Sequence, residues 1–143
     1  MGPSGCGKTT FMNAVIDRAP YGVPSGEVKV NGVSRGLDKA SKVIGFVPQD
    51  DTVHPNLTFF QTLLYSAQLR LPRASTQLVK LAHVQHVIKV LGLTKVQNAL
   101  VGTPESRGVS GGQKKRVNIG MELAAMPSFL LTDEPASGCR PAL

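Results

Sequence analysis

The sequence predicts an α/β protein with a helical insertion, and three features of the chain point to this fold class. A glycine-rich loop at the N-terminus leads directly into a helix-like segment. Short apolar segments typical of strands occur both early and late in the chain, at residues 43–47 and 129–132. Between them, apolar residues keep helical spacing over roughly residues 52–126. Strands separated by helical segments favour an α/β sheet that is covered by helices.

The composition is that of a globular protein with one domain. A chain of 143 residues, of which 41% are hydrophobic and 17% charged, is long enough to bury a sizeable core. The apolar runs stop far short of the ~18 residues that a membrane-spanning helix needs. Cys6 and Cys139 give neither a metal-binding spacing nor a disulfide framework, so we expect a reducing, cytosolic setting.

The net charge of +7 is compatible with nucleic acid, an acidic membrane surface or a phosphorylated ligand. The basic residues are scattered, however, and the tight cluster is Lys114-Lys115-Arg116. Five Phe and two Tyr are few for the stacking of bases. We therefore expect no nucleic-acid partner.

The elements of the N-terminal part follow from local patterns. Thr9 to Arg18 is predicted as a helix with Phe11 and its apolar neighbours on one face, followed by proline-rich turns. Val28 and Val30 alternate with polar residues, as in a half-exposed strand. The apolar run over residues 43–47 predicts a buried strand that Pro48 ends.

Three helices are expected next, and then a strand. Thr58 with Gln61 forms a capping-box pattern that opens the first helix. Residues 78–91 repeat apolar positions every three or four residues, and Gly92 is placed to end that second helix. Ser110 with Gln113 is another capping box, before a third helix that ends by Pro127 and a strand at 129–132. We therefore divide the chain into a core, residues 1–51 and 127–143, and a helical insertion at 52–126.

The N-terminal loop matches the phosphate-binding pattern G-x-x-x-x-G-K-[ST]. It reads Gly2-Pro3-Ser4-Gly5-Cys6-Gly7-Lys8-Thr9, and Thr10 follows. Its glycines allow successive N–H groups to point at phosphate oxygens, and the helix that follows adds the positive end of its dipole. Lys8 supplies a charge for the β- and γ-phosphates, and the Thr9 hydroxyl can ligate Mg²⁺. The loop from Gly2 to Thr10 is thus the predicted ATP site.

Two carboxylates follow the last apolar strand. Asp133 stands at the C-terminal end of that strand, where it can hold Mg²⁺ opposite Thr9. Glu134 lies one residue further and can act on a water that attacks the γ-phosphate. A solvated Asp-Glu turn before Pro135 is the alternative, and the upstream phosphate loop argues against it.

A second anion site is predicted at the start of the third helix. Its residues are Ser110, Gly111, Gly112 and Gln113. A serine N-cap followed by two glycines exposes free N–H groups at a helix N-terminus. A single nucleotide does not need two separate phosphate-binding sites on one subunit. Two subunits that face each other head to tail do need both sites, because each nucleotide would then lie between the loop of one subunit and the helix start of the other.

These motifs resemble the nucleotide-binding domain of ATP-binding cassette (ABC) transporters. Residues 2–9 are similar to the Walker A motif, Gln49 to the Q-loop, residues 110–113 to the signature motif and residues 129–134 to the Walker B motif. The resemblance covers nearly the whole chain. The sequence of residues 45–51 and 107–116 is most similar to subfamily G, the White and pleiotropic-drug-resistance type. It implies a P-loop NTPase core with an inserted α-helical subdomain, which binds and hydrolyses ATP with Mg²⁺.

The resemblance also implies further site residues and partners. Gln49 would contact the Mg²⁺ and the attacking water, and its loop would touch a transmembrane domain. A second nucleotide-binding domain would complete each ATP site, and the protein would be membrane-associated on the cytosolic face. Arg140 stands where the family has an acidic D-loop residue, and no histidine follows it. The resemblance thus predicts a chain truncated at both ends. His54, His83 and His86 lie in the helical block and are expected to be surface or packing residues.

Two alternatives remain beside the transporter engine. One is a truncated nucleotide-binding remnant that binds ATP weakly or folds poorly and does no catalysis. The other is a soluble ABC ATPase of DNA repair or translation. The separation of 101 positions from Thr9 to Ser110 (110 − 9) leaves no room for the long coiled coil of the repair relatives. The transported substrate and its direction of movement do not follow from this sequence.

Overall fold

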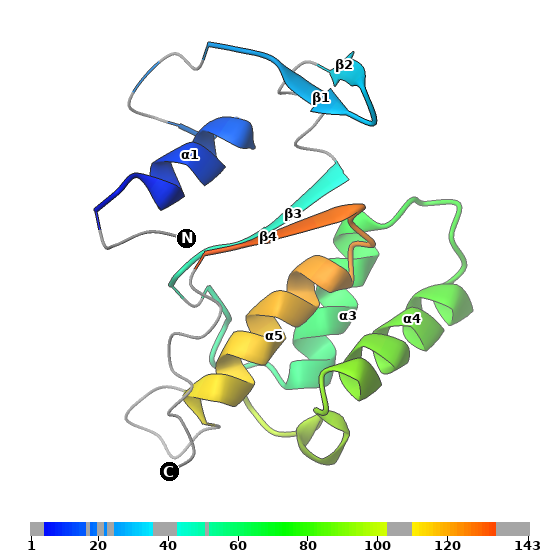
Figure 1. Ribbon diagram of the computed structural model, residues 1–143. Helices are drawn as coiled ribbons and strands as arrows, with labels where there is room; N and C mark the ends of the chain where they lie inside the picture. The colour runs from blue at the N-terminus through cyan, green and yellow to red at the C-terminus, as the bar shows by residue number, and fades with distance from the viewer. Residues whose placement is uncertain are drawn as a thin grey trace.

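The computed structural model describes residues 5–16, 18–19, 22, 25–35, 43–50, 52–102 and 110–133. Its elements, in chain order, are α1 (Lys8–Val15), β1 (Val28–Val30), β2 (Val33–Arg35), β3 (Ile44–Val47), α3 (Phe59–Arg70), α4 (Gln77–Val90), a 3₁₀ turn η2 (Thr94–Val96), α5 (Gly111–Leu123) and β4 (Phe129–Thr132). Strands β3 and β4 lie side by side between α1 on one side and the three long helices on the other (Figure 1). The described part of the chain is therefore a mixed α/β structure.

Strands β3 and β4 bring the middle of the chain beside its C-terminal part. They are parallel, with Ile44 opposite Phe129 and Val47 opposite Thr132. A β-carbon at Gly45 would lie 3.1 Å from both a Leu130 methyl and the Pro127 ring, so glycine permits this close packing. After the strands, the amide of Asp133 donates to the Val47 carbonyl at 3.0 Å. The ends of both strands thus meet at one edge, where Gln49 and Asp133 follow.

The hydrophobic core lies among α3, α4 and α5. Its fully buried members include Phe59 and Leu63 of α3, Ile88 of α4 and Val117 of α5. Helices α3 and α5 approach closely at Gly120, where an added β-carbon would lie 2.7 Å from a Leu63 methyl. Helix α5 packs directly against β3, and α3 and α4 pack against α5 and against each other on the same side of the strand pair (Figure 1).

The predicted helix starts are confirmed in atomic detail. Both capping boxes form: the Thr58 hydroxyl accepts from the Gln61 amide and the Ser110 hydroxyl accepts from the Gln113 amide, and each glutamine side chain accepts from the amide of its cap. Gly92 has φ +66°, and the amides of Gly92 and Leu93 donate to the carbonyls of Lys89 and Ile88. This is the Schellman arrangement that ends a helix at glycine.

Three details differ from the sequence-based expectation. Helix α1 ends at Val15 and not at Arg18, and no residue of it is buried. A second strand, β2, pairs antiparallel with β1 through a turn at Asn31 and Gly32, which both have positive φ. The Asn-Gly pair between two valines signals such a hairpin, because both turn positions favour residues that tolerate positive φ. Helix α4 begins at Gln77, where the Thr76 hydroxyl caps it.

Candidate nucleotide-binding site

The N-terminus of α1 has the backbone geometry of an open anion site. Gly5 and Gly7 adopt φ values of +82° and +86°, a region that residues with a β-carbon rarely enter. Gly7 is the N-cap and offers no side chain to the first turn. Helices α3, α4 and α5 instead begin with a capping hydroxyl. The first turn of α1 thus has no side-chain cap of the kind that satisfies helix-start amides. Of the predicted loop, Gly2, Pro3 and Ser4 lie outside the described residues.

Thr9 and Asp133, which are 124 positions apart in the chain, meet at this helix end. The Thr9 hydroxyl donates to Asp133 Oδ2 at 2.6 Å. Asp133 is only 2% exposed, and it is held by the hydrogen bond from its amide to β3. Thr9 itself is exposed, so the hydroxyl–carboxylate pair opens toward solvent on the helix side.

The described residues of the predicted loop beside Thr9 are Cys6, Lys8 and Thr10, together with two glycines. Lys8, the first residue of α1, is half-buried, and its ammonium lies 3.8 Å from the Cys6 sulfur. Cys6 and Thr10 are exposed. A β-carbon at Gly5 or Gly7 would meet no atom within 4 Å, so the space beside the loop is open. A cation, a hydroxyl and a helix start without a side-chain cap thus line one accessible space, which suits a polyanion.

The donor set at this point fits Mg²⁺. A threonine hydroxyl and an aspartate carboxylate are hard oxygen ligands, and they are already within hydrogen-bonding distance of each other. In the described residues, no group of three or more His, Cys, Asp or Glu forms a metal-binding cluster. The fit therefore depends on a site that shares its ligands with phosphate and water, as magnesium sites with nucleotides do.

Gln49 lies at the same edge of the sheet as Asp133. It follows β3 after Pro48 and is exposed. Because β3 and β4 are parallel and in register, their C-terminal ends place Gln49 and Asp133 on one side of the molecule. Glu134, the second predicted carboxylate, is outside the described residues.

The Ser110 end of α5 is a separate site. Gly111 is exposed and Gly112 half-buried, and a β-carbon at either would meet no atom within 4 Å. Figure 1 shows the start of α5 well apart from the start of α1. This chain therefore does not bring its two predicted anion sites onto one ligand.

Comparison with known sequences agrees with this geometry. The sequence model of the family described as ABC transporter matches residues 1–137, nearly the whole chain. The chain belongs to the ABC transporter family. This nucleotide-binding chain is also similar to individual transporters. It is 51% identical over 138 residues to ABC transporter G family member 28 of Arabidopsis thaliana and 49% identical to ABC transporter G family member 25 of Oryza sativa subsp. japonica. It is 45% identical to a probable ATP-dependent permease of Saccharomyces cerevisiae.

These relatives are much longer than this ABC chain. Each match covers 96% of the chain but only 12%, 14% and 13% of the respective relative. In the described residues, no helix has the length and apolar character that crossing a membrane requires. The similarity confirms an ATP-binding domain of the ABC type that resembles subfamily G, with the P-loop NTPase fold of that family.

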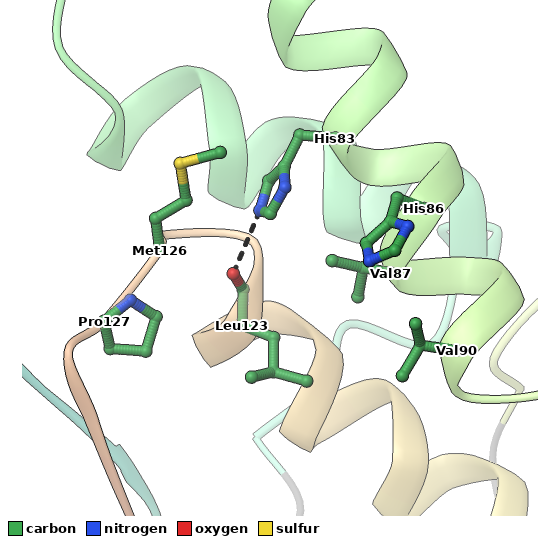
Figure 2. A pocket seen from close by; sticks show the side chains of 7 residues that line it. All are labelled: His83, His86, Val87, Val90, Leu123, Met126 and Pro127. Atoms are coloured by element: carbon green, nitrogen blue, oxygen red, sulfur yellow. Dashed lines mark hydrogen bonds between the residues drawn. The ribbon is translucent and has the colours of Figure 1, made fainter.

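The histidines of this ABC domain lie away from the site. His83 Nε2 lies 3.1 Å from the Leu123 carbonyl, and His86 is exposed one turn along α4. Both line a pocket of about 290 Å³ between α4 and the end of α5. Figure 2 shows His83 on the side of Met126 and His86 on the side of Val90. The third histidine, His54, is exposed and accepts from the Asn56 amide through Nδ1. The expectation of surface and packing roles is thus consistent with their surroundings.

Sequence reasoning missed two buried side chains that support the site. Lys115 and Asn118 of α5 are both 4% exposed and contact the segment that follows β3. Lys115 belongs to the basic cluster at residues 114–116, so that cluster is not one exposed patch. The available signal was their three-residue spacing, which places both on one helix face.

Proposed function

We propose that this chain binds Mg·ATP and hydrolyses it as the nucleotide-binding domain of a transporter similar to subfamily G. The observation that carries the proposal is the 2.6 Å hydrogen bond between Thr9 and Asp133 at the open end of α1. A buried carboxylate facing a hydroxyl at a glycine-rich helix N-terminus is the arrangement that a magnesium-bound polyphosphate needs.

Different residues at the site would bind the phosphates, hold the metal and activate the attacking water. Lys8 and the amides of residues 2–10 would hold the β- and γ-phosphates, because a glycine-rich loop before a helix directs N–H groups at one anion. Thr9, Asp133 and Gln49 would hold Mg²⁺, directly or through water. When bound, the metal would neutralise charge on the phosphates. Glu134 would orient the attacking water and accept its proton.

A second nucleotide-binding domain would complete the site. The start of α5 carries unobstructed glycines and lies apart from the loop at α1. In a head-to-tail pair, residues 110–113 of one copy would face the phosphates held by the other copy. Each ATP would then lie between two subunits, which makes hydrolysis dependent on association.

The transport role is proposed from the relatives. The relatives are named as ABC transporters and a permease. This chain would supply the ATPase of such a protein at the cytosolic face of a membrane. The division into a core, residues 1–51 and 127–143, and a helical subdomain at 52–126 is part of this proposal. The shared core of α3, α4 and α5 supports it.

The test is equilibrium binding of a fluorescent ATP analogue, followed by phosphate release, each with Mg²⁺ and with EDTA. For the chain alone, the expected result is binding that Mg²⁺ strengthens, with little phosphate release. Phosphate release should appear when a second nucleotide-binding domain and the flanking segments are supplied. Binding without hydrolysis, also after a second nucleotide-binding domain is supplied, would instead favour the non-catalytic remnant. Absence of Mg²⁺-dependent binding would refute the proposal.

A further inference from the structure

Lys115 makes an unusual pair of contacts with the loop that follows β3. Its ammonium donates to the carbonyl of Pro48 at 2.9 Å and to the carbonyl of Gln49 at 2.9 Å. The side chain comes from the second turn of α5, 66 positions further along the chain. It therefore connects the backbone at Gln49 with the helix that begins at Ser110.

Burial makes these contacts strong. Lys115 is 4% exposed, and within the described residues no carboxylate forms a salt bridge with it. A buried ammonium is unfavourable unless hydrogen bonds replace its water shell. The two carbonyl oxygens do so here. Moving the loop away from α5 would remove these acceptors from a buried charge, so the loop and the helix are held together.

Asn118 adds contacts from the same face of α5. Its amide nitrogen lies 3.5 Å from the Asp50 carbonyl, and its amide oxygen accepts from the Thr52 hydroxyl at 3.4 Å. These bonds are longer than those of Lys115. Together the two side chains contact Pro48, Gln49, Asp50 and Thr52.

Helix α5 can transmit a displacement of this segment. It is continuous from Gly111 to Leu123, and its first turn is closed by the capping box at Ser110. Lys115 is four residues after Gly111, so the contacts to the loop are close to the signature end of the helix. A shift of the Gln49 loop would therefore move the Ser110 end with it.

We propose that Lys115 is a positioning residue that makes the Gln49 loop and the Ser110 end of α5 respond to nucleotide as one unit. This inference rests on the proposed ATP site. In the pair of domains proposed above, each copy holds one ATP near its own Gln49 loop and presents its Ser110 end to the ATP of the other copy. Lys115 would therefore connect these two sites within one copy.

Amide hydrogen exchange of the chain tests the connection. Exchange is followed in peptides covering 49–54 and 111–117, without nucleotide and along a titration with Mg·ATP. In the wild-type chain, both segments should change with the same midpoint. Without nucleotide, Lys115→Met should speed exchange in 49–54 by roughly tenfold or more, because the two carbonyls lose their donor. With Mg·ATP, the variant should lose the response of 111–117 while its ATP affinity stays within about threefold of wild type.

Two variants complete the design. Lys89→Met replaces an exposed lysine of α4 and should leave both segments unchanged. Lys115→Gln keeps a donor in the buried position, so it should restore part of the protection and the paired response. This rescue separates loop positioning from a general loss of structure, which circular dichroism checks in parallel.

The possible results separate the two proposals. Unchanged exchange of 49–54 in Lys115→Met would overturn the role of Lys115, as would different midpoints for the two segments in the wild-type chain. That second criterion holds even if the variants fail to fold. If the wild-type chain does not bind Mg·ATP, the ATP proposal fails and with it the nucleotide response, whereas nucleotide-free exchange still decides whether Lys115 holds the loop.

Discussion

The hydroxyl of Thr9 donates a 2.6 Å hydrogen bond to the buried carboxylate of Asp133. The first residue is in the opening turn of α1 and the second directly follows β4. This contact spans most of the chain, and it brings the two predicted magnesium ligands to one point. It also gives the Asp133 carboxylate a donor in the absence of nucleotide.

Asp133→Asn should remove most of the effect of Mg²⁺ on ATP affinity. The amide keeps the size of the side chain but lacks the charge that attracts a divalent cation. We expect magnesium-supported affinity to fall by roughly 10- to 100-fold, while affinity measured in EDTA changes little. The measurement is titration with a fluorescent ATP analogue in both conditions. Glu27→Gln removes an exposed carboxylate of the hairpin segment and should have no effect.

Lys8→Ala should weaken Mg·ATP binding with and without a second domain present. Hydrogen bonds to charged groups contribute about 1.5–3 kcal/mol, which corresponds to a loss of roughly 10- to 150-fold in affinity. The same analogue titration measures it, and Lys89→Ala, which removes an exposed lysine of α4, is the control. Equal affinities of Lys8→Ala and wild type would contradict the assignment of the phosphate loop.

Glu134→Gln should lower hydrolysis much more than binding. The carboxylate is proposed to act on water, so its loss should cost about 10²- to 10⁴-fold in turnover and leave ATP affinity nearly unchanged. Single-turnover phosphate release is the measurement, made with the flanking segments and second domain present. If binding fell as severely as in Lys8→Ala, Glu134 would not be the base.

Gly112→Asp should block hydrolysis in trans. The structure leaves open space around a β-carbon at Gly112, so this chain accommodates the substitution. The new carboxylate would repel the nucleotide held by the other copy. It would leave nucleotide binding at the N-terminal loop of the variant copy unchanged. Mixing equal amounts of Gly112→Asp and Lys8→Ala should restore about a quarter of the wild-type phosphate release, since half of the random pairs carry one intact site. No recovery on mixing would contradict the head-to-tail arrangement.

Leu63→Ala should destabilise the helical core, whereas Leu69→Ala on the same helix should not. Leu63 is fully buried against α5, and Leu69 is 86% exposed. We expect the first change to lower the free energy of unfolding by about 2–5 kcal/mol and the second to change it by less than about 0.5 kcal/mol. Urea unfolding followed by circular dichroism measures both. Equal losses would show that α3 does not pack as described.

The sequence by itself determined the features that depend on local chemistry. The hydroxyls of Thr58 and Ser110 cap their helices through contacts with a residue three positions further on, so these helix starts depend on local sequence alone. Gly92 ends its helix because glycine tolerates positive φ. The glycine-lysine-threonine pattern likewise predicts a phosphate loop, since such a loop needs only backbone amides and one cation from neighbouring residues. The hairpin at Asn31 and Gly32 was equally local, although its signal was overlooked.

Only the tertiary structure decided which distant side chains meet. That Thr9 contacts Asp133 requires the start of α1 to lie at the C-terminal end of β4. That Lys115 reaches the carbonyls of Pro48 and Gln49 requires α5 to pack against β3. A lysine in a basic triplet has the pattern of a solvated residue, and its burial depends on acceptors from a segment 66 positions away. A buried ammonium group needs hydrogen-bond acceptors in place of water, and here another element supplies them. Its burial therefore depends on the packing of the whole protein and not on the local sequence.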